Sequence, residues 1–181
     1  ENAFKARVKQ KYASIPVAAC VYPAPVVVPA GATVGSWLTI DANGGGYGNN
    51  PSTGATLETP YSTFWEDGRH QFLYLSSDLQ ALGVCPNTDV KGVAFAAQGA
   101  GTTMGMRNCK VRMKNEPTNN LSDFIYSGLQ DCGAYGTYPN PPLVVVNGWN
   151  AHQFSTNWQW LGVGNNMLVE FCFDNQDWTS N

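Results

Sequence analysis

The feature that most constrains the fold of this chain is a period-two alternation of apolar and polar residues in two segments, 107–114 and 165–175. In the first segment Cys109, Val111 and Met113 are expected to face a core, because successive side chains of a β-strand point to opposite faces. The 19 Gly and 11 Pro among 181 residues supply frequent turns between short strands. The sequence therefore predicts an all-β fold, a two-sheet antiparallel β-sandwich.

The residues that alternate with this apolar stripe are mostly basic. Lys110, Arg112 and Lys114 are expected to point away from the core. We interpret them as a solvated sheet face, with a site for an anionic ligand as the alternative. Outside residues 1–11, six basic residues face twelve acidic ones, so the chain is a poor match for a nucleic-acid backbone.

One short capping helix is predicted near residues 77–82. Ser77 is placed at its start, with Gln80 at the spacing of a capping box, and Gly83 is placed as its stop. Three leucines follow at i, i+4 and i+7: Leu75, Leu79 and Leu82. Because these three share one helix face, the helix is expected to cover the end of a sheet and close the core.

The chain is expected to divide into an extended Val/Pro-rich arm, residues 1–35, and a β-sandwich domain, residues 36–181. Prolines at positions 16, 23, 25 and 29 exclude a helix interior and a central strand from the arm. The most apolar part of the arm is Val26, Val27 and Val28. These valines are too apolar to stay uncovered, so they either pack on their own domain or add a strand to the exposed sheet edge of another copy.

Composition predicts an extracellular or cell-surface location. Charged residues make up only 13% of the chain, about half the usual share, so Asn, Thr, Ser and Gln must supply much of the polar surface. No run of 18 apolar residues is present, and no membrane span is expected. The first residue, Glu1, suggests a processed or partial chain.

The sequence offers no recognisable catalytic set, and we expect no enzyme and no cofactor. The only histidines, His70 and His152, are not near a nucleophile signature. The adjacent carboxylates Glu66 and Asp67 are expected to cap a turn or to pair with Arg69. The Gly-rich loop of residues 41–50 lacks the closing Glu of a helix–loop–helix calcium site, so no metal site is expected.

The five cysteines form no CxxC pair, which argues against a zinc site. Cys109 and Cys172 fall in predicted core strands, where a thiol serves as a small buried hydrophobe. Cys85 and Cys132 fall in turn-rich segments, where a bridge is more useful, and at least one disulfide is expected.

Trp158 and Trp160 lie on the same side of an extended segment. If that side is exposed, the two rings form a platform for a glycan. If it is buried, they form a layer of the core, which is the interpretation that we favour because most strand tryptophans pack inside.

Residues 59–175 contain, in order, an aromatic-rich turn, an R-x-Q pair, the short helix, several strands, and the motifs G-W-N, N-N and L-V-E. The residues concerned are Arg69, Gln71, Gly148, Trp149, Asn150, Phe154, Trp160, Gly162, Asn165, Asn166, Leu168, Val169, Glu170, Asp174 and Asn175. This pattern resembles a β-sandwich module found in secreted and cell-surface proteins of Bacteroidota. The resemblance implies a jelly-roll-like fold, export and a non-catalytic role. Two departures are that such modules continue with further strands after the final Asn, and that residues 1–58 lie outside the match.

We therefore expect a non-catalytic extracellular structural or adhesive module. It is expected to contact copies of itself or other surface proteins, and a self-assembling surface filament would use the arm for strand exchange. The alternative is a carbohydrate-binding module of a secreted multidomain protein, with Trp158 and Trp160 as its glycan platform.

Overall fold

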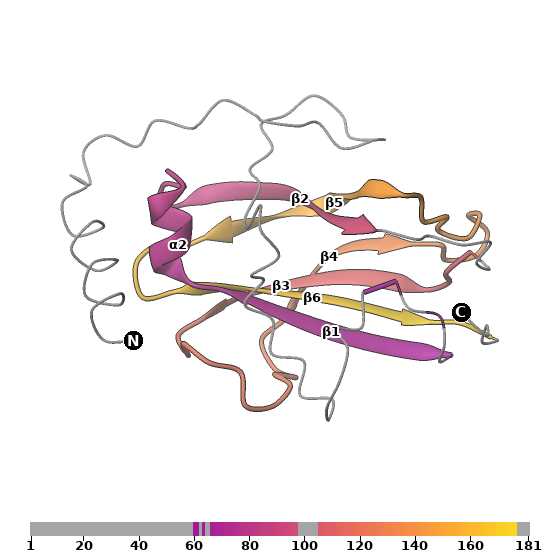
Figure 1. Ribbon diagram of the computed structural model, residues 1–181, viewed down its shortest axis with the longest axis horizontal. Helices are drawn as coiled ribbons and strands as arrows, with labels where there is room; N and C mark the ends of the chain where they lie inside the picture. Colours follow the sequence, from indigo (N-terminus) through magenta and orange to yellow (C-terminus); the bar gives the residue numbers. More distant parts are fainter. Residues whose placement is uncertain (1–59, 62, 64–65, 98–104, 177–181) are drawn as a thin grey trace.

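A computed structural model describes residues 60–61, 63, 66–97 and 105–176 (Figure 1). Several predictions lie outside these residues: the arm with Val26, Val27 and Val28, the boundary between residues 35 and 36, and the glycine-rich loop at 41–50. In the described part, no helix is long and apolar enough to cross a membrane.

The described residues form two antiparallel sheets and one short helix (Figure 1). The four-stranded sheet has the order β1-β6-β3-β4, and the second sheet pairs β2 with β5. The elements are β1 (Asp67–Tyr74), α2 (Ser76–Ala81), β2 (Thr88–Ala97), β3 (Cys109–Glu116), β4 (Gln130–Tyr135), β5 (Gly148–Trp160) and β6 (Asn166–Asp174). The prediction of an all-β, two-sheet sandwich with one short helix is confirmed.

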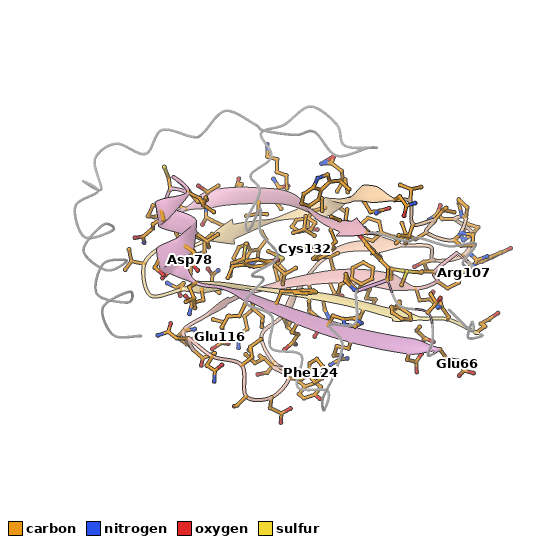
Figure 2. All side chains as sticks on the ribbon, in the orientation of Figure 1. Glu66, Asp78, Arg107, Glu116, Phe124 and Cys132 are labelled. Carbon is orange, nitrogen blue, oxygen red and sulfur yellow. The ribbon has the colours of Figure 1, made fainter. Side chains whose placement is uncertain are left out.

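Strand β6 is one of the two inner strands of the four-stranded sheet, between β1 and β3, and is buried on both faces. Its inner residues Val169 and Phe171 lie opposite Met113 and Val111 of β3 in the register. On its outer face Leu168 is also fully buried, packed with Leu73 and Leu121. The outer face is covered by residues 117–129, between β3 and β4, which we call the covering segment. This segment folds back under the sheet on the side away from β2 and β5, where Figure 2 labels Phe124.

The two long sides of the sandwich differ. On one side β4 lies along β5, and side chains bond the two strands: the Ser155 hydroxyl donates to the Cys132 carbonyl at 3.1 Å, and the Tyr135 hydroxyl donates to the Gln153 carbonyl. On the other side β2 lies over β1, and the contact is made by aromatic rings instead. The first side is therefore closed by hydrogen bonds between strands of different sheets.

Helix α2 begins differently from the prediction. Its N-cap residue is Leu75, which has no side chain that can accept a hydrogen bond, and Ser77 lies inside the first turn, where its hydroxyl bonds only to Asp78. The cap comes from a distant residue: the Asn166 side-chain oxygen accepts from the Ser76 N–H at 2.7 Å. Asn166 is buried, and its amide nitrogen donates to the Thr118 carbonyl. One side chain therefore joins the helix, β6 and the outer covering segment.

The predicted end of the helix is correct. Gly83 adopts a positive φ of 85°, and its N–H donates to the Gln80 carbonyl at 2.9 Å. The Val84 N–H donates to the Leu79 carbonyl at the same distance, which completes a Schellman motif. Leu79 is buried in the main core, so the helix closes one end of the sandwich as expected.

Replacing Asn166 by Ala should lower the free energy of unfolding by about 2–3 kcal/mol, because it removes the side-chain partner of a partly buried helix N–H and of a partly buried carbonyl. Ser77→Ala is the matched control and should change stability by less than about 0.5 kcal/mol. Urea unfolding of both variants measures the difference. Equal destabilisation by the two changes would mean that Ser77, as first expected, caps the helix.

Candidate functional site

The most concentrated group of ionisable side chains lies on the outer face of the four-stranded sheet. Glu170 of β6 is fully buried there. The register places Gln71 of β1 and Arg112 of β3 directly opposite it on its two sides. The Gln71 amide donates to the carboxylate at 2.7 Å, Arg112 forms an ion pair with it, and the Arg69 guanidinium nitrogen Nε lies 3.9 Å away. We call these four residues the Glu170 cluster.

The Glu170 cluster also holds the covering segment in place. The Gln71 side chain donates to the Ile125 carbonyl at 2.6 Å and accepts from the Ile125 N–H at 2.9 Å. The ring of Tyr126 lies with its centroid 5.1 Å from Cζ of Arg69, a cation–π contact. Burial acts to lower the pKa of Arg112, but the neighbouring Glu170 carboxylate outweighs it and the pKa is raised. The Glu170 cluster is therefore a structural lock, which holds the covering segment on the sheet. The carboxylate partner of Arg69 is Glu170 rather than the expected Glu66 or Asp67.

The basic residues expected on a solvated face of β3 are paired with acids. Lys110 Nζ lies 4.0 Å from a carboxylate oxygen of Asp131, and Lys114 Nζ lies 2.8 Å from Glu116. Arg112 completes the series through Glu170. This face therefore lacks the unpaired positive charge that an anion site would need.

His152 lies in the core between the sheets. Only 1% of its surface is exposed, and its Nε2 lies 2.7 Å from the Tyr61 hydroxyl. The rings of Phe95, Tyr135 and Phe171 surround it at centroid distances of 5.0 to 6.0 Å. Its Nδ1 has no hydrogen-bond partner among the described residues, and burial lowers its pKa to about 4. A neutral histidine packed among aromatic rings fits a core residue.

The expected disulfide is absent from the described part of the chain, where no disulfide joins Cys85, Cys109, Cys132 or Cys172. Cys85 and Cys132, the pair of positions favoured for a bridge, are therefore not joined. Cys132 lies in strand β4 rather than in a turn, and its side chain is buried in the core. Burial raises the pKa of the Cys109 thiol to about 12 and that of Cys132 to about 11, so both stay protonated.

Trp158 and Trp160 form a layer of the core, and the alternative prediction that they form a glycan platform is wrong. Their exposed fractions are 3% and 1%, so neither ring face is open to a sugar. The Trp160 indole N–H donates to the Asn165 carbonyl at 2.6 Å and fixes the turn into β6. The favoured interpretation, burial, is confirmed.

A contact surface that sequence reasoning missed lies on the side of the sandwich where β2 covers β1. Phe72 and Phe95 meet there at a centroid distance of 5.3 Å. None of the ten residues of β2 is buried, although its inner apolar residues pack on the core. Five residues of β1 and β2 that are only partly buried define what we call the open seam: Phe72, Tyr74, Val90, Val93 and Phe95.

A second apolar feature follows β4. Tyr138, Val144 and Val146 are 88%, 70% and 48% exposed, and we call them the end strip. The backbone beside it is partly occupied, because Leu143 exchanges hydrogen bonds with Met106 and the Asn150 side chain bonds both the N–H and the carbonyl of Val146.

Among residues 60–61, 63, 66–97 and 105–176, no group of three His, Cys, Asp or Glu side chains is placed to hold a metal ion. No protein-family model, curated protein or solved structure matches the chain. The resemblance to a Bacteroidota module stays a prediction.

Replacing Glu170 by Gln should lower the free energy of unfolding by about 2–4 kcal/mol, because Arg112 would lose its buried anion and keep only the exposed Asp131, 4.0 Å away. Asp131→Asn is the control: Asp131 also pairs with Arg112, at 4.0 Å, but its side chain is 66% exposed, so the loss should stay below about 0.5 kcal/mol. Denaturant unfolding separates the two. A Glu170→Gln protein as stable as the unchanged chain would contradict the lock.

His152 should make the fold sensitive to acid. Its pKa is about 4 when folded and 6.5 in an unfolded chain, so the unfolded state takes up the proton first as the pH falls. The free energy of unfolding should therefore fall by about 3 kcal/mol in total as the pH is lowered from about 6.5 to about 4. In His152→Phe this loss over that window should disappear. Stability measured at several pH values for both proteins decides, and parallel curves would contradict the assignment.

Proposed function

We propose that this chain is a non-catalytic structural or adhesive module of the extracellular space or cell surface, which works through contact with copies of itself or with other surface proteins. What supports the proposal is the use of its polar groups. The Glu170 cluster joins three strands and the covering segment, and His152 packs among core rings. These side chains serve the fold, and they do not converge on an accessible cleft with a nucleophile.

The observation that carries the proposal is the unequal size of the two sheets. Four strands face two in the described part of the chain, and the smaller sheet ends at the open seam. A two-stranded sheet is marginal alone and gains stability when further strands join it. Strand exchange through Val26, Val27 and Val28 would supply such a strand and would link copies into a surface filament.

Carbohydrate binding is the second candidate, and it now needs other rings than Trp158 and Trp160. Tyr126 is 67% exposed and lies 6.2 Å from Phe124, centroid to centroid, on the covering segment. An exposed ring beside the Arg69 guanidinium offers both stacking and hydrogen bonding to a sugar. A glycan array probed with the unchanged chain and with Tyr126→Ala tests this candidate, and binding lost in the variant would favour it.

The self-assembling form of the proposal predicts that the full chain associates as its concentration rises. Size-exclusion chromatography with light scattering should show masses at multiples of 19.6 kDa. A chain with Val26, Val27 and Val28 all changed to Asp should remain at 19.6 kDa with an unchanged circular dichroism spectrum, because charged side chains resist transfer into an apolar contact. A full chain that stays monomeric at every concentration would contradict self-assembly.

A further inference from the structure

We propose that the open seam is the acceptor for the segment Pro25–Pro29 of a neighbouring copy, which adds as a third strand beside β2. This inference rests on the proposed function, since it names the surface through which the copies would associate. The occupant of the seam is the arm of a second molecule.

The geometry of β2 provides the place for such a strand. Among the described residues β2 pairs only with β5, so no described strand lies along its other edge. Phe95 of β2 reaches both Phe72 of β1 and Phe171 of β6, at centroid distances of 5.3 and 6.0 Å, so β2 lies above these two strands. A strand on the free edge of β2 would lie above the outer edge of β1. It would cover Phe72 and Tyr74, which are only partly buried.

The proline pattern of the arm matches an edge strand with one usable side. In extended chain the N–H and C=O of one residue point to the same side, and those of the next residue point to the opposite side. Prolines 23, 25 and 29 all occupy odd positions, so Val27 is the one N–H donor on that side of the segment. Ala24, Val26 and Val28 keep theirs on the other side. Such a segment can pair with β2 and then present an edge that poorly accepts another strand.

The end strip is a weaker acceptor although its valines are more exposed. Its backbone groups at Leu143 and Val146 are already bonded to Met106 and to the Asn150 side chain. A strand added there would have to replace these bonds. At the open seam an added strand would displace none of the described β2–β5 pairs.

The length of chain before Tyr61 favours a neighbouring copy over the same molecule. Tyr61 is buried beside the seam, with its ring centroid 6.2 Å from that of Phe95, so the preceding chain arrives at this place. Residues 29–60 separate Val28 from Tyr61 and can span up to roughly 110 Å. A return to the same seam needs only a few residues. The 13-residue β5 is about 43 Å long, so the connection is longer than the sandwich itself. A connection longer than the span it must bridge lowers the effective concentration of the arm at the seam of its own molecule.

Photo-crosslinking in the full chain tests the proposal. Benzoylphenylalanine replaces Val27 in chains grown with ¹⁵N, which are mixed with an equal amount of unmodified ¹⁴N chains and irradiated. Mass spectrometry should find crosslinks to peptides of β1 or β2 that contain Phe72 or Phe95, with half of them joining a ¹⁵N peptide to a ¹⁴N peptide. Crosslinks at the seam only within ¹⁵N chains would mean that the arm binds its own molecule. Crosslinks to the end strip would overturn the acceptor.

Two proline variants give a matched control. Val26→Pro removes an N–H from the side that pairs with β2 and should weaken association at least tenfold in light scattering. Val27→Pro makes the same chemical change on the other side and should leave association within threefold of the unchanged chain. Equal effects would overturn the strand geometry. If the unchanged chain never associates, self-assembly itself fails; if it associates without crosslinks at the seam, only this inference fails.

Discussion

The buried carboxylate of Glu170 is the interaction on which the four-stranded sheet depends. A charge removed from water is costly, and it is tolerated only when its partners are close and well oriented. Here those partners come from the two flanking strands, Gln71 of β1 and Arg112 of β3, at positions directly opposite in the register. Because a slip of one residue would carry these side chains to the other face, the cluster fixes the alignment of all three strands. Gln71 extends the same constraint to the covering segment.

Part of this was accessible from the sequence. The alternation in residues 107–114 identified β3 and its inner residues, because one face of β3 meets the core and the other carries polar groups. The same alternation in β6 separates Glu170 from Val169 and Phe171, but it could not indicate that both faces of this strand are covered. That burial depends on a turn-rich segment between β3 and β4, which has no periodicity to read. The cap of α2 was missed for a similar reason, since Asn166 lies 90 residues from Ser76.

The residues of the family resemblance acquire physical roles in the fold. Arg69, Gln71 and Glu170, far apart in sequence, meet in one cluster. Asn150 and Asn166 bond the backbone of a loop and of a helix start. Each supplies a buried polar group that a specific backbone position requires. In the described part of the chain, these residues of the pattern therefore support the backbone of the fold.

The contrast between the two sides of the sandwich links the scaffold to the proposed contact. On the side of β4 and β5, hydroxyl and amide groups join the sheets, and those strands are held by neighbours. On the side of β1 and β2, the seam relies on aromatic contacts, and no described strand pairs with the second edge of β2. An exposed edge is a hazard unless the strands behind it hold a single register, since a sliding edge would accept many partners. The Glu170 cluster supplies that restraint for β1, so the polar lock on one face is what makes a specific apolar seam on the other feasible.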